Sequence, residues 1–290
     1  MPIYTGVADA NGDFNISFGS NSYTSGEKIT VTAEKDSAEK TIELYAPSEP
    51  TGGGVIQFSG TLDNFPQNIG GVKIIGIAGA ISANAFSAAT AGVLWRDATS
   101  LEIGAGVTSI GDNCFSQWGM AQTLILPNTL LTVGQGAFSG LGALKDLIMP
   151  NSITGIGMNC FSFCSNLENL TLSNSLTLIP VNAFANNAKL KAVYLPDSVI
   201  IVQNQAFLGC RGIKSVRIGP NCTSLGGWSF NGMIDCDVIT CERTTPPTMV
   251  DNNSFENLKS TCVFKVPAGS VAAYQSAPGW SAFAARIQAI

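Results

Sequence analysis

Phenylalanine recurs in this 290-residue sequence at a fixed interval of 23 residues, and this periodicity constrains the fold more than any other feature. The equally spaced copies are Phe115, Phe138, Phe161, Phe184, Phe207 and Phe230, with Phe86 and Phe255 as less regular outer members. A repeat this short cannot bury its own apolar residues, so successive copies must stack on one another. The interval therefore predicts a solenoid.

The residues around each phenylalanine repeat as well. Nine and eleven positions after it, pairs such as Leu147 and Met149 alternate with other residues, and this period of two indicates a short strand with one buried face. Three of these strands are followed by a proline, which cannot donate to a strand ladder: Pro127, Pro150 and Pro196. The sequence therefore predicts a mainly β fold whose copies stack as a parallel strand ladder, about 4.7–4.9 Å apart.

Two stretches carry the whole pattern: LPDSVIIVQNQAFLGC at residues 195–210 and MPNSITGIGMNCFSFCSNLENLTL at residues 149–172. They resemble the BspA-like leucine-rich repeat family, and the resemblance covers about residues 70–265. It implies a leucine-rich-repeat solenoid that displays an interaction surface. CERTTPPTM at residues 241–249, together with residues 263–290, resembles the closing segment of such proteins from Bacteroides-type gut bacteria.

Two departures from the family pattern stand out. Trp118 and Met233 replace the small residue or cysteine usual three positions after the phenylalanine. The alanine-rich stretch at residues 87–95 contains an insertion relative to the 23-residue step, and we expect it to bulge from the stack as a short helix.

The first 50 residues lack the repeat. Apolar residues alternate on both sides of Asn11-Gly12, a dipeptide typical of hairpin turns, and further strands are predicted at residues 28–33 and 41–45. The segment resembles the latter part of a bacterial immunoglobulin-like domain. Because so small a sheet buries little surface, we expect it to dock on another chain.

The predicted organisation has four parts. They are a small antiparallel β anchoring domain at residues 1–46, a linker at 47–54, the leucine-rich repeats at 55–265 and a helical cap at 266–290. Within the cap, Ser270 is predicted to N-cap one short helix with Val271 and Tyr274 on one face, and Ser281 is predicted to start another with Phe283 and Ile287.

The composition excludes several kinds of site. The chain has no histidine, which excludes Ser-His-Asp and Cys-His nucleophile pairs and histidine-ligated metals. Its net charge is −5 and no basic cluster is present, so nucleic acid is not an expected partner. No apolar run is long enough for a membrane-spanning helix, and the first residues lack the pattern of a signal peptide.

No catalytic residue, metal site or cofactor is predicted, and the chain is expected not to be an enzyme. Asp9, Asn11 and Asp13 imitate a calcium loop, but Phe14 and Ser20 stand where an EF-hand needs glycine and glutamate. A carboxylate pair for glycan hydrolysis is the weaker alternative, because Asp146 is the only acid predicted on the exposed strand face of the regular copies.

Eight cysteines occupy repeat positions rather than metal-binding or disulfide spacings. Cys114 and Cys160 precede a phenylalanine two copies apart, which puts them about 10 Å apart and too far for a bridge. We therefore predict buried free thiols and folding in a reducing compartment, with a Cys236–Cys241 bridge as the alternative.

The outward side chains of the predicted strands form the candidate binding surface. They are Ile125, Asp146, Ile148, Asn169, Thr171, Tyr194 and Arg217. Exposed aliphatic and tyrosine side chains on a rigid sheet suit an interaction surface, and the alternative is an ordinary solvated strand face.

Two functional hypotheses follow. The first is a virion protein of a phage that infects Bacteroides-like hosts, such as a fibre, tail or capsid-decorating adhesin made in the host cytoplasm. The second is a cell-surface or secreted bacterial adhesin that binds host proteins or glycans. In both, residues 1–46 would dock on other virion or envelope proteins and the repeats would bind the host surface, while self-association stays open.

Overall fold

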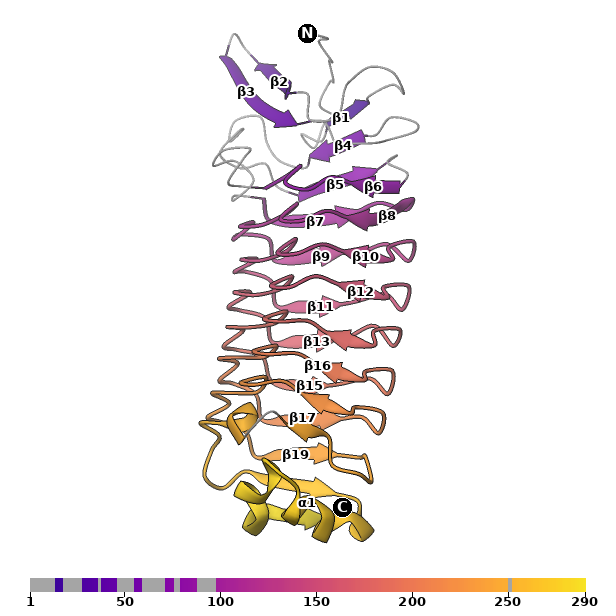
Figure 1. Cartoon of the computed structure of the whole chain (residues 1–290). Coiled ribbons are helices and arrows are strands. Elements are labelled where there is room, and N and C mark those ends of the chain that lie inside the picture. Colours follow the sequence, from indigo (N-terminus) through magenta and orange to yellow (C-terminus); the bar gives the residue numbers. More distant parts are fainter. Residues whose placement is uncertain are drawn as a thin grey trace. The chain divides into compact units, whose positions relative to one another are not determined.

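The computed structural model describes residues 14–17, 28–35, 38–45, 55–58, 71–75, 79–87, 98–249 and 252–290. The chain divides into two compact units, Met1–Leu144 and Lys145–Ile290. Figure 1 labels the helices and strands along the chain. The predicted linker at residues 47–54 and the predicted turn at Asn11-Gly12 lie outside the described residues, as does most of the expected helix at 87–95.

The first unit contains a five-stranded sheet in the order β1-β4-β5-β7-β9. Its strands are β1 (Phe14–Ser17), β4 (Val55–Phe58), β5 (Gly71–Ile75), β7 (Ser100–Ile103) and β9 (Thr123–Ile125). The pairs β5–β7 and β7–β9 are parallel, whereas β1–β4 and β4–β5 are antiparallel. The antiparallel strands β4 and β1 therefore extend the parallel ladder, and β1 is the outer strand of this sheet within the described residues.

Two further groups of strands belong to this unit. The second strand of each coil forms a parallel ladder from β6 (Gly79–Ile81), β8 (Val107–Ile110) and β10 (Thr132–Val133). β2 (Lys28–Lys35) and β3 (Ala38–Tyr45) form an antiparallel pair. The strands predicted at residues 28–33 and 41–45 are thus confirmed and are longer than expected. The immunoglobulin-like resemblance stays a prediction.

The second unit repeats the coil design. Its first strands are β11 (Asp146–Ile148), β13 (Asn169–Thr171), β15 (Ala192–Tyr194), β17 (Ser215–Ile218), β19 (Val238–Cys241) and β21 (Val263–Val266). Its second strands are β12 (Gly155–Ile156), β14 (Leu178–Ile179), β16 (Ile201–Val202), β18 (Ser224–Leu225) and β20 (Thr248–Met249).

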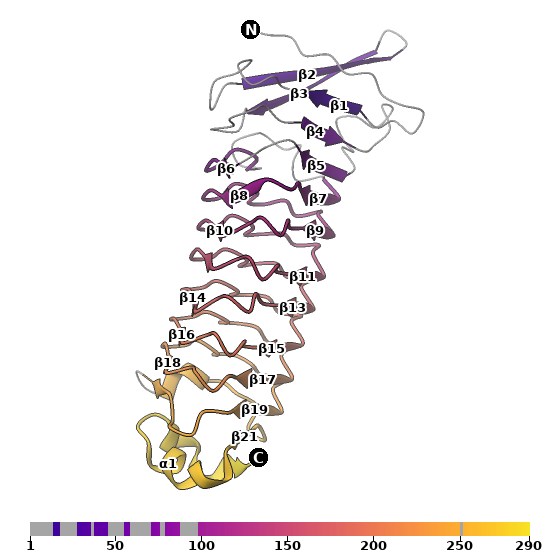
Figure 2. The ribbon, with the colours of Figure 1, turned by 90° about the vertical axis from the view of Figure 1, so that its right-hand side faces the viewer.

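Neighbouring coils of this unit pair in parallel with a one-repeat offset, as Leu147 with Leu170 and Val193 with Val216 show. Figure 2 shows the first strands along one side of this unit and the second strands along the other. The predicted mainly β, leucine-rich-repeat solenoid with a parallel ladder is confirmed.

The repeating phenylalanines form a buried column inside each unit. In the second unit, Phe161, Phe184, Phe207 and Phe230 are fully buried and Phe255 almost so. Consecutive rings stack with centroids 5.3–5.8 Å apart and planes within 11°. Phe86, Phe115 and Phe138 stack in the same way in the first unit. The 23-residue interval is therefore the length of one coil.

The turns around each ring need left-handed backbone. Residues two positions before the ring have φ of 52° to 60° at Asn113, Gly136, Asn159, Asn182 and Gln205. Residues two positions after it are also left-handed, as at Asn186 and Gly209. Glycine suits this conformation because it has no Cβ to crowd the following carbonyl oxygen, and asparagine suits it because its short polar side chain can hydrogen-bond to the local backbone. Two positions, Phe163 and Trp228, carry aromatic residues instead.

The C-terminal segment closes the end of the second unit with helices and a last strand. After β21 come η4 (Ala268–Ser270), α1 (Val271–Ser276), η5 (Trp280–Arg286) and β22 (Ile287–Ala289), following the short η3 (Asn252–Phe255) earlier in the chain. The side chain of Ser270 makes no capping hydrogen bond to α1, so the predicted cap is wrong although the helix begins where expected.

The second predicted helix also differs from the structure. Ser281 lies inside η5, which begins at Trp280, and Ile287 belongs to β22 rather than to a helix. β22 pairs in parallel with β21, Phe264 opposite Ile287. The reason is backbone pairing: the open side of β21 offers hydrogen bonds that a further helical turn would leave unmade.

Candidate binding face on the parallel ladder

The strand face is defined here as the outward side chains of the first strands of the second unit. Of the predicted residues it includes Asp146, Ile148, Asn169, Thr171, Tyr194 and Arg217. Alternation along each strand directs these side chains away from the core, whereas Leu147 and Val193 between them are buried. Ile125 is exposed in the same way on β9 of the first unit.

The N-terminal end of the strand face carries a paired acid and amide beside an exposed apolar side chain. Asn169 Nδ2 donates to Asp146 Oδ1 at 2.5 Å, across one step of the ladder. Ile148 lies opposite Thr171 and is 69% exposed. Next to this pair, Lys191 forms a 2.5 Å ion pair with Glu168, and its hydrogen bond lowers the pKa of that carboxyl. Polar partners thus hold fixed positions around an exposed aliphatic side chain.

Further along, Tyr194 and Arg217 form the second predicted group. Their strands pair so that the two residues are opposite each other, and the guanidinium carbon of Arg217 lies 4.4 Å from the centre of the Tyr194 ring. Tyr194 is 60% exposed. The arrangement is a cation–π contact, which orients the tyrosine ring while one of its faces remains open.

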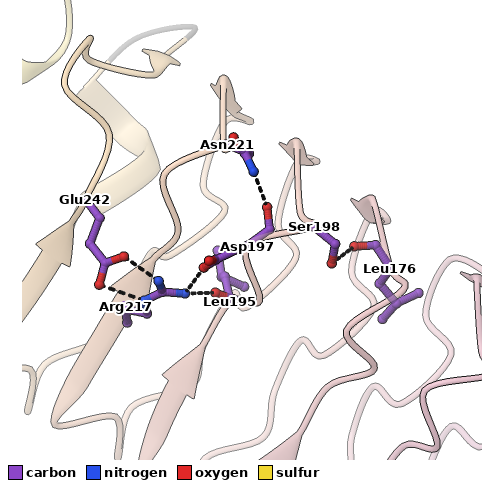
Figure 3. A network of polar contacts seen from close by, with 7 residues as sticks. All are labelled: Leu176, Leu195, Asp197, Ser198, Arg217, Asn221 and Glu242. Carbon is purple, nitrogen blue, oxygen red and sulfur yellow. Dashed lines mark hydrogen bonds and ion pairs between the residues drawn. The ribbon is translucent and has the colours of Figure 1, made fainter.

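Arg217 is enclosed by acceptors (Figure 3). Its Nε donates to Glu242 Oε1 at 2.9 Å and its Nη2 to Glu242 Oε2, a two-bond fork. Its Nη1 lies 2.6 Å from Asp197 Oδ1 and donates to the Leu195 carbonyl at 2.9 Å. The bonds to Glu242, ahead of the other causes, raise the pKa of the guanidinium above its usual value.

This network corrects the expectation of an exposed Arg217, whose side chain is only 16% exposed. The positive charge of Arg217 is already neutralised by the carboxylates of Asp197 and Glu242, so Arg217 does not favour an anionic ligand. Arg217 therefore positions Tyr194 and joins three successive coils through Asp197 and Glu242, neither of which is among the predicted site residues. The signal was present, because both acids come directly after a ladder strand or its proline.

The turns beside this network are bonded from coil to coil. Asn221 Nδ2 donates to the Asp197 carbonyl at 2.9 Å, and Ser198 Oγ donates to the Leu176 carbonyl at 2.7 Å (Figure 3). A surface fixed by such bonds loses little conformational freedom when a partner binds, which favours affinity.

The cysteines lie in the interior, as predicted. All eight are buried with free thiols. Desolvation raises the pKa of Cys210 and of Cys222 to about 12, which keeps these thiols protonated and unreactive. Cys236 hydrogen-bonds to Cys262 on the neighbouring coil, and this bond raises the pKa of Cys236. Cys241 instead accepts from the Tyr274 hydroxyl at 3.0 Å, so the structure places Cys262, and not Cys241, beside Cys236.

In the described ranges, no group of three or more potential metal-ligating side chains comes together. No helix in that part of the chain is long and apolar enough to span a membrane.

The sequence matches the family model of the BspA type leucine rich repeat region, in six copies over residues 81–211 and 177–277. The chain belongs to the BspA-type leucine-rich repeat family. The match spans the coils that carry the phenylalanine column, so the strand face is a surface built by BspA-type repeats.

Solved structures with similar folds come from several bacteria. A leucine-rich repeat protein of T. pallidum has 22% identity and a TM-score of 0.49, covering 62% of this chain and 87% of its own. One from Bacteroides ovatus has 17% identity and a TM-score of 0.45, covering 83% and 70%. A leucine-rich cell surface protein of Faecalibacterium prausnitzii has 16% identity and a TM-score of 0.29, covering 81% and 92%. No curated protein matches the sequence.

Proposed function

We propose that this chain is a non-enzymatic attachment protein whose strand face binds a protein on the surface of a host cell. One observation supports the proposal above others: Ile148 and Tyr194 are exposed on a hydrogen-bonded ladder whose polar neighbours already have partners. Apolar anchors of this kind, held in place before binding, are what protein interfaces use as hot spots.

A binding assay on whole cells tests the strand face. Fluorescently labelled full-length protein is titrated onto intact host cells, and the double variant Ile148→Lys, Tyr194→Ala should lose most of the bound signal. Ile234→Ser is the matched control, because Ile234 is an exposed aliphatic residue in a turn rather than on the strand face. Equal binding of the double variant and the wild type would contradict the proposal.

Treating the cells with a protease before the assay distinguishes the partner. Binding through the strand face should disappear, because the proposed partner is a protein. Binding that survives protease and disappears after glycosidase treatment would assign a glycan to this face instead.

For the setting we propose a phage virion or a bacterial envelope. The buried free thiols favour folding in a reducing cytoplasm, where virion proteins are made. Membership of the BspA-type family favours a bacterial surface, and the similar F. prausnitzii protein is named a cell surface protein. Mass spectrometry of purified virions and of envelope fractions separates the two settings by the fraction in which the chain is found.

In either setting we propose that residues 1–46 form the anchor, by strand addition to another chain. Within the described residues β1 is the last strand of its sheet, so it is placed to accept a further strand. Deleting residues 1–50 should leave soluble, folded repeats that no longer join the particle or envelope. Wild-type occupancy of the shortened chain would assign the anchoring contact to the repeats.

A further inference from the structure

Two exposed aromatic residues occupy backbone positions that disfavour them. Phe163 has φ of 59° and Trp228 has φ of 54°, at turn positions where most other coils place asparagine or glycine. Burial of the ring does not compensate for this backbone conformation, because Phe163 is 59% and Trp228 is 43% exposed. A left-handed backbone conformation at an aromatic residue that does not pack in the core is a reason to look for a functional role.

Trp228, of these two residues, has polar side chains hydrogen-bonded around it that could hold a ligand. Its Nε1 donates to Glu256 Oε2 at 3.2 Å, and Asn231 Nδ2 donates to the same oxygen at 3.1 Å. Asn257 Nδ2 donates to Asn231 Oδ1 at 3.4 Å. These four residues are defined here as the Trp228 cluster. In the part of the chain that the structure describes, both bonds to the carboxylate fall on Oε2, so Oε1 can accept from a ligand hydroxyl.

The backbone fixes the tryptophan and leaves its surroundings open. The main-chain nitrogen of Trp228 donates to Asn253 Oδ1 at 3.2 Å, which ties the turn to η3 on the next coil. The corresponding turn position after the buried ring is Gly232, beside Gly209 of the preceding coil. Phe163 and Asn186 hold this same position on earlier coils, whereas Gly209 and Gly232 carry no side chain there.

We propose that the Trp228 cluster is a second binding site, for a neutral glycan built from β-linked rings of glucose type. The axial C–H groups of such a ring form a flat apolar face that can lie on the indole, while its hydroxyls exchange hydrogen bonds with Glu256, Asn231 and Asn257. The site lies on the turn edge of the coil, outside the strand face, and does not depend on the function proposed for that face.

Glycan binding fits the cluster better than a protein interface. A protein hot spot needs neighbouring apolar side chains that exclude water, whereas the groups bonded around this indole are a carboxylate and two amides. The carboxylate disfavours acidic sugars, because two negative charges would be brought together. A neutral ring with one apolar face and several hydroxyls matches both parts of the cluster.

The test uses full-length protein and isothermal titration calorimetry with two probes, cellohexaose and N-acetylated chitohexaose. At least one probe should bind, and Trp228→Asn should weaken that binding by about tenfold or more, as expected for loss of a stacking platform. Because asparagine suits the left-handed backbone, the variant should have a melting temperature equal to or above that of the wild type. Loss of binding then cannot be ascribed to unfolding.

Phe163→Asn is the matched control. It removes an exposed aromatic from the same kind of left-handed turn but lacks the carboxylate and amide partners, so binding should stay within about twofold of wild type. The proposal is overturned if neither probe binds, if Trp228→Asn binds as wild type does, or if Phe163→Asn weakens binding equally. Adhesion to cells that depends on Trp228 and is lost after protease treatment, with neither probe bound, would make the tryptophan a protein contact instead.

Discussion

A single buried ring in each coil stacks on the equivalent rings of the neighbouring coils. Phe184 stacks on Phe161 and on Phe207, with centroids 5.8 and 5.3 Å away, and is fully buried. The small residues before each ring, such as Ala183 and Cys160, leave the backbone free to pack closely. Removing a ring therefore leaves a cavity that the rigid turns around it cannot fill.

Replacing Phe184 with alanine should lower the free energy of unfolding by about 3–5 kcal/mol, the usual cost of deleting a buried aromatic side chain. Urea denaturation followed by circular dichroism measures this loss. Phe163→Asn is the comparison, because that ring is exposed and its backbone is left-handed, and it should cost nothing or stabilise slightly. A loss under about 1 kcal/mol for Phe184→Ala would contradict the stacked column.

The contribution of a charged side chain to stability also depends on its neighbours. Replacing Arg217 with lysine keeps the charge but loses the two-bond fork to Glu242, so unfolding should become easier by about 1–3 kcal/mol. Lys214→Ala removes a solvent-exposed pair with Asp235 and should change stability by less than about 1 kcal/mol. If both variants lose the same free energy of unfolding in urea denaturation, the Arg217 network contributes no more to stability than an exposed ion pair does.

At the scale of elements, the C-terminal cap covers the last coil with aromatic residues from its helices. Trp280 is fully buried, contacts Phe255 and Phe264, and donates from Nε1 to the Pro247 carbonyl at 2.8 Å. Tyr274 of α1 is fully buried, and its hydroxyl shares its one proton between the Arg243 carbonyl at 2.8 Å and Cys241 Sγ at 3.0 Å. The cap thus satisfies backbone groups of the preceding coil as well as covering its apolar end.

Trp280→Ala should cost about 3–5 kcal/mol and promote aggregation, because it uncovers Phe255 and Phe264 at the end of the ladder. Thermal unfolding with light scattering measures both effects. Ser281→Ala is the matched control: the hydroxyl is exposed inside η5, so the change should cost less than about 0.5 kcal/mol. A loss of about 1 kcal/mol would instead indicate a helix N-cap at Ser281.

For the molecule as a whole, buried thiols and the absence of histidine determine how stability depends on pH. No histidine titrates near neutrality, so the free energy of unfolding should change little between about pH 5 and 8. Below that range, the ion pairs with Lys191 and Lys259 lower the pKa of Glu168 and of Asp237. Their contribution is present above the unfolded-state pKa of these acids, and it is lost as the pH falls through the lower folded-state values.

Alkaline pH should destabilise the protein. Burial raises the pKa of Cys210 and Cys222 to about 12, whereas a thiol in the unfolded chain has a pKa of about 8.5. The folded state then holds more protons, so the free energy of unfolding falls as the pH rises from about 8.5 toward 12. Urea denaturation at several pH values in reducing buffer measures the slope. The double variant Cys210→Ala, Cys222→Ala should show a shallower slope, and a flat profile for the wild type up to about pH 10 would contradict the explanation.

The spacing of identical residues was enough to predict the repeat unit and its core. Phe161 or Phe184 is buried whatever its exact neighbours are, because every coil offers the same apolar surroundings at the same offset. The strands at Asp146–Ile148 and Asn169–Thr171 follow from the alternation of their own residues. These features depend on local pattern and on repetition, and both can be read from a single sequence.

Contacts in which one coil differs from the next become visible in the folded chain and not in the repeat pattern. Arg217 bonds to Glu242 and Asp197. Trp228 donates a hydrogen bond to Glu256, and Cys236 lies beside Cys262. Ile287 joins β21 as a strand because of the ladder edge it meets, although its own sequence favoured a helix. The physical reason is that such contacts depend on which side chains two particular coils bring together, and the average pattern of the repeat does not contain that information.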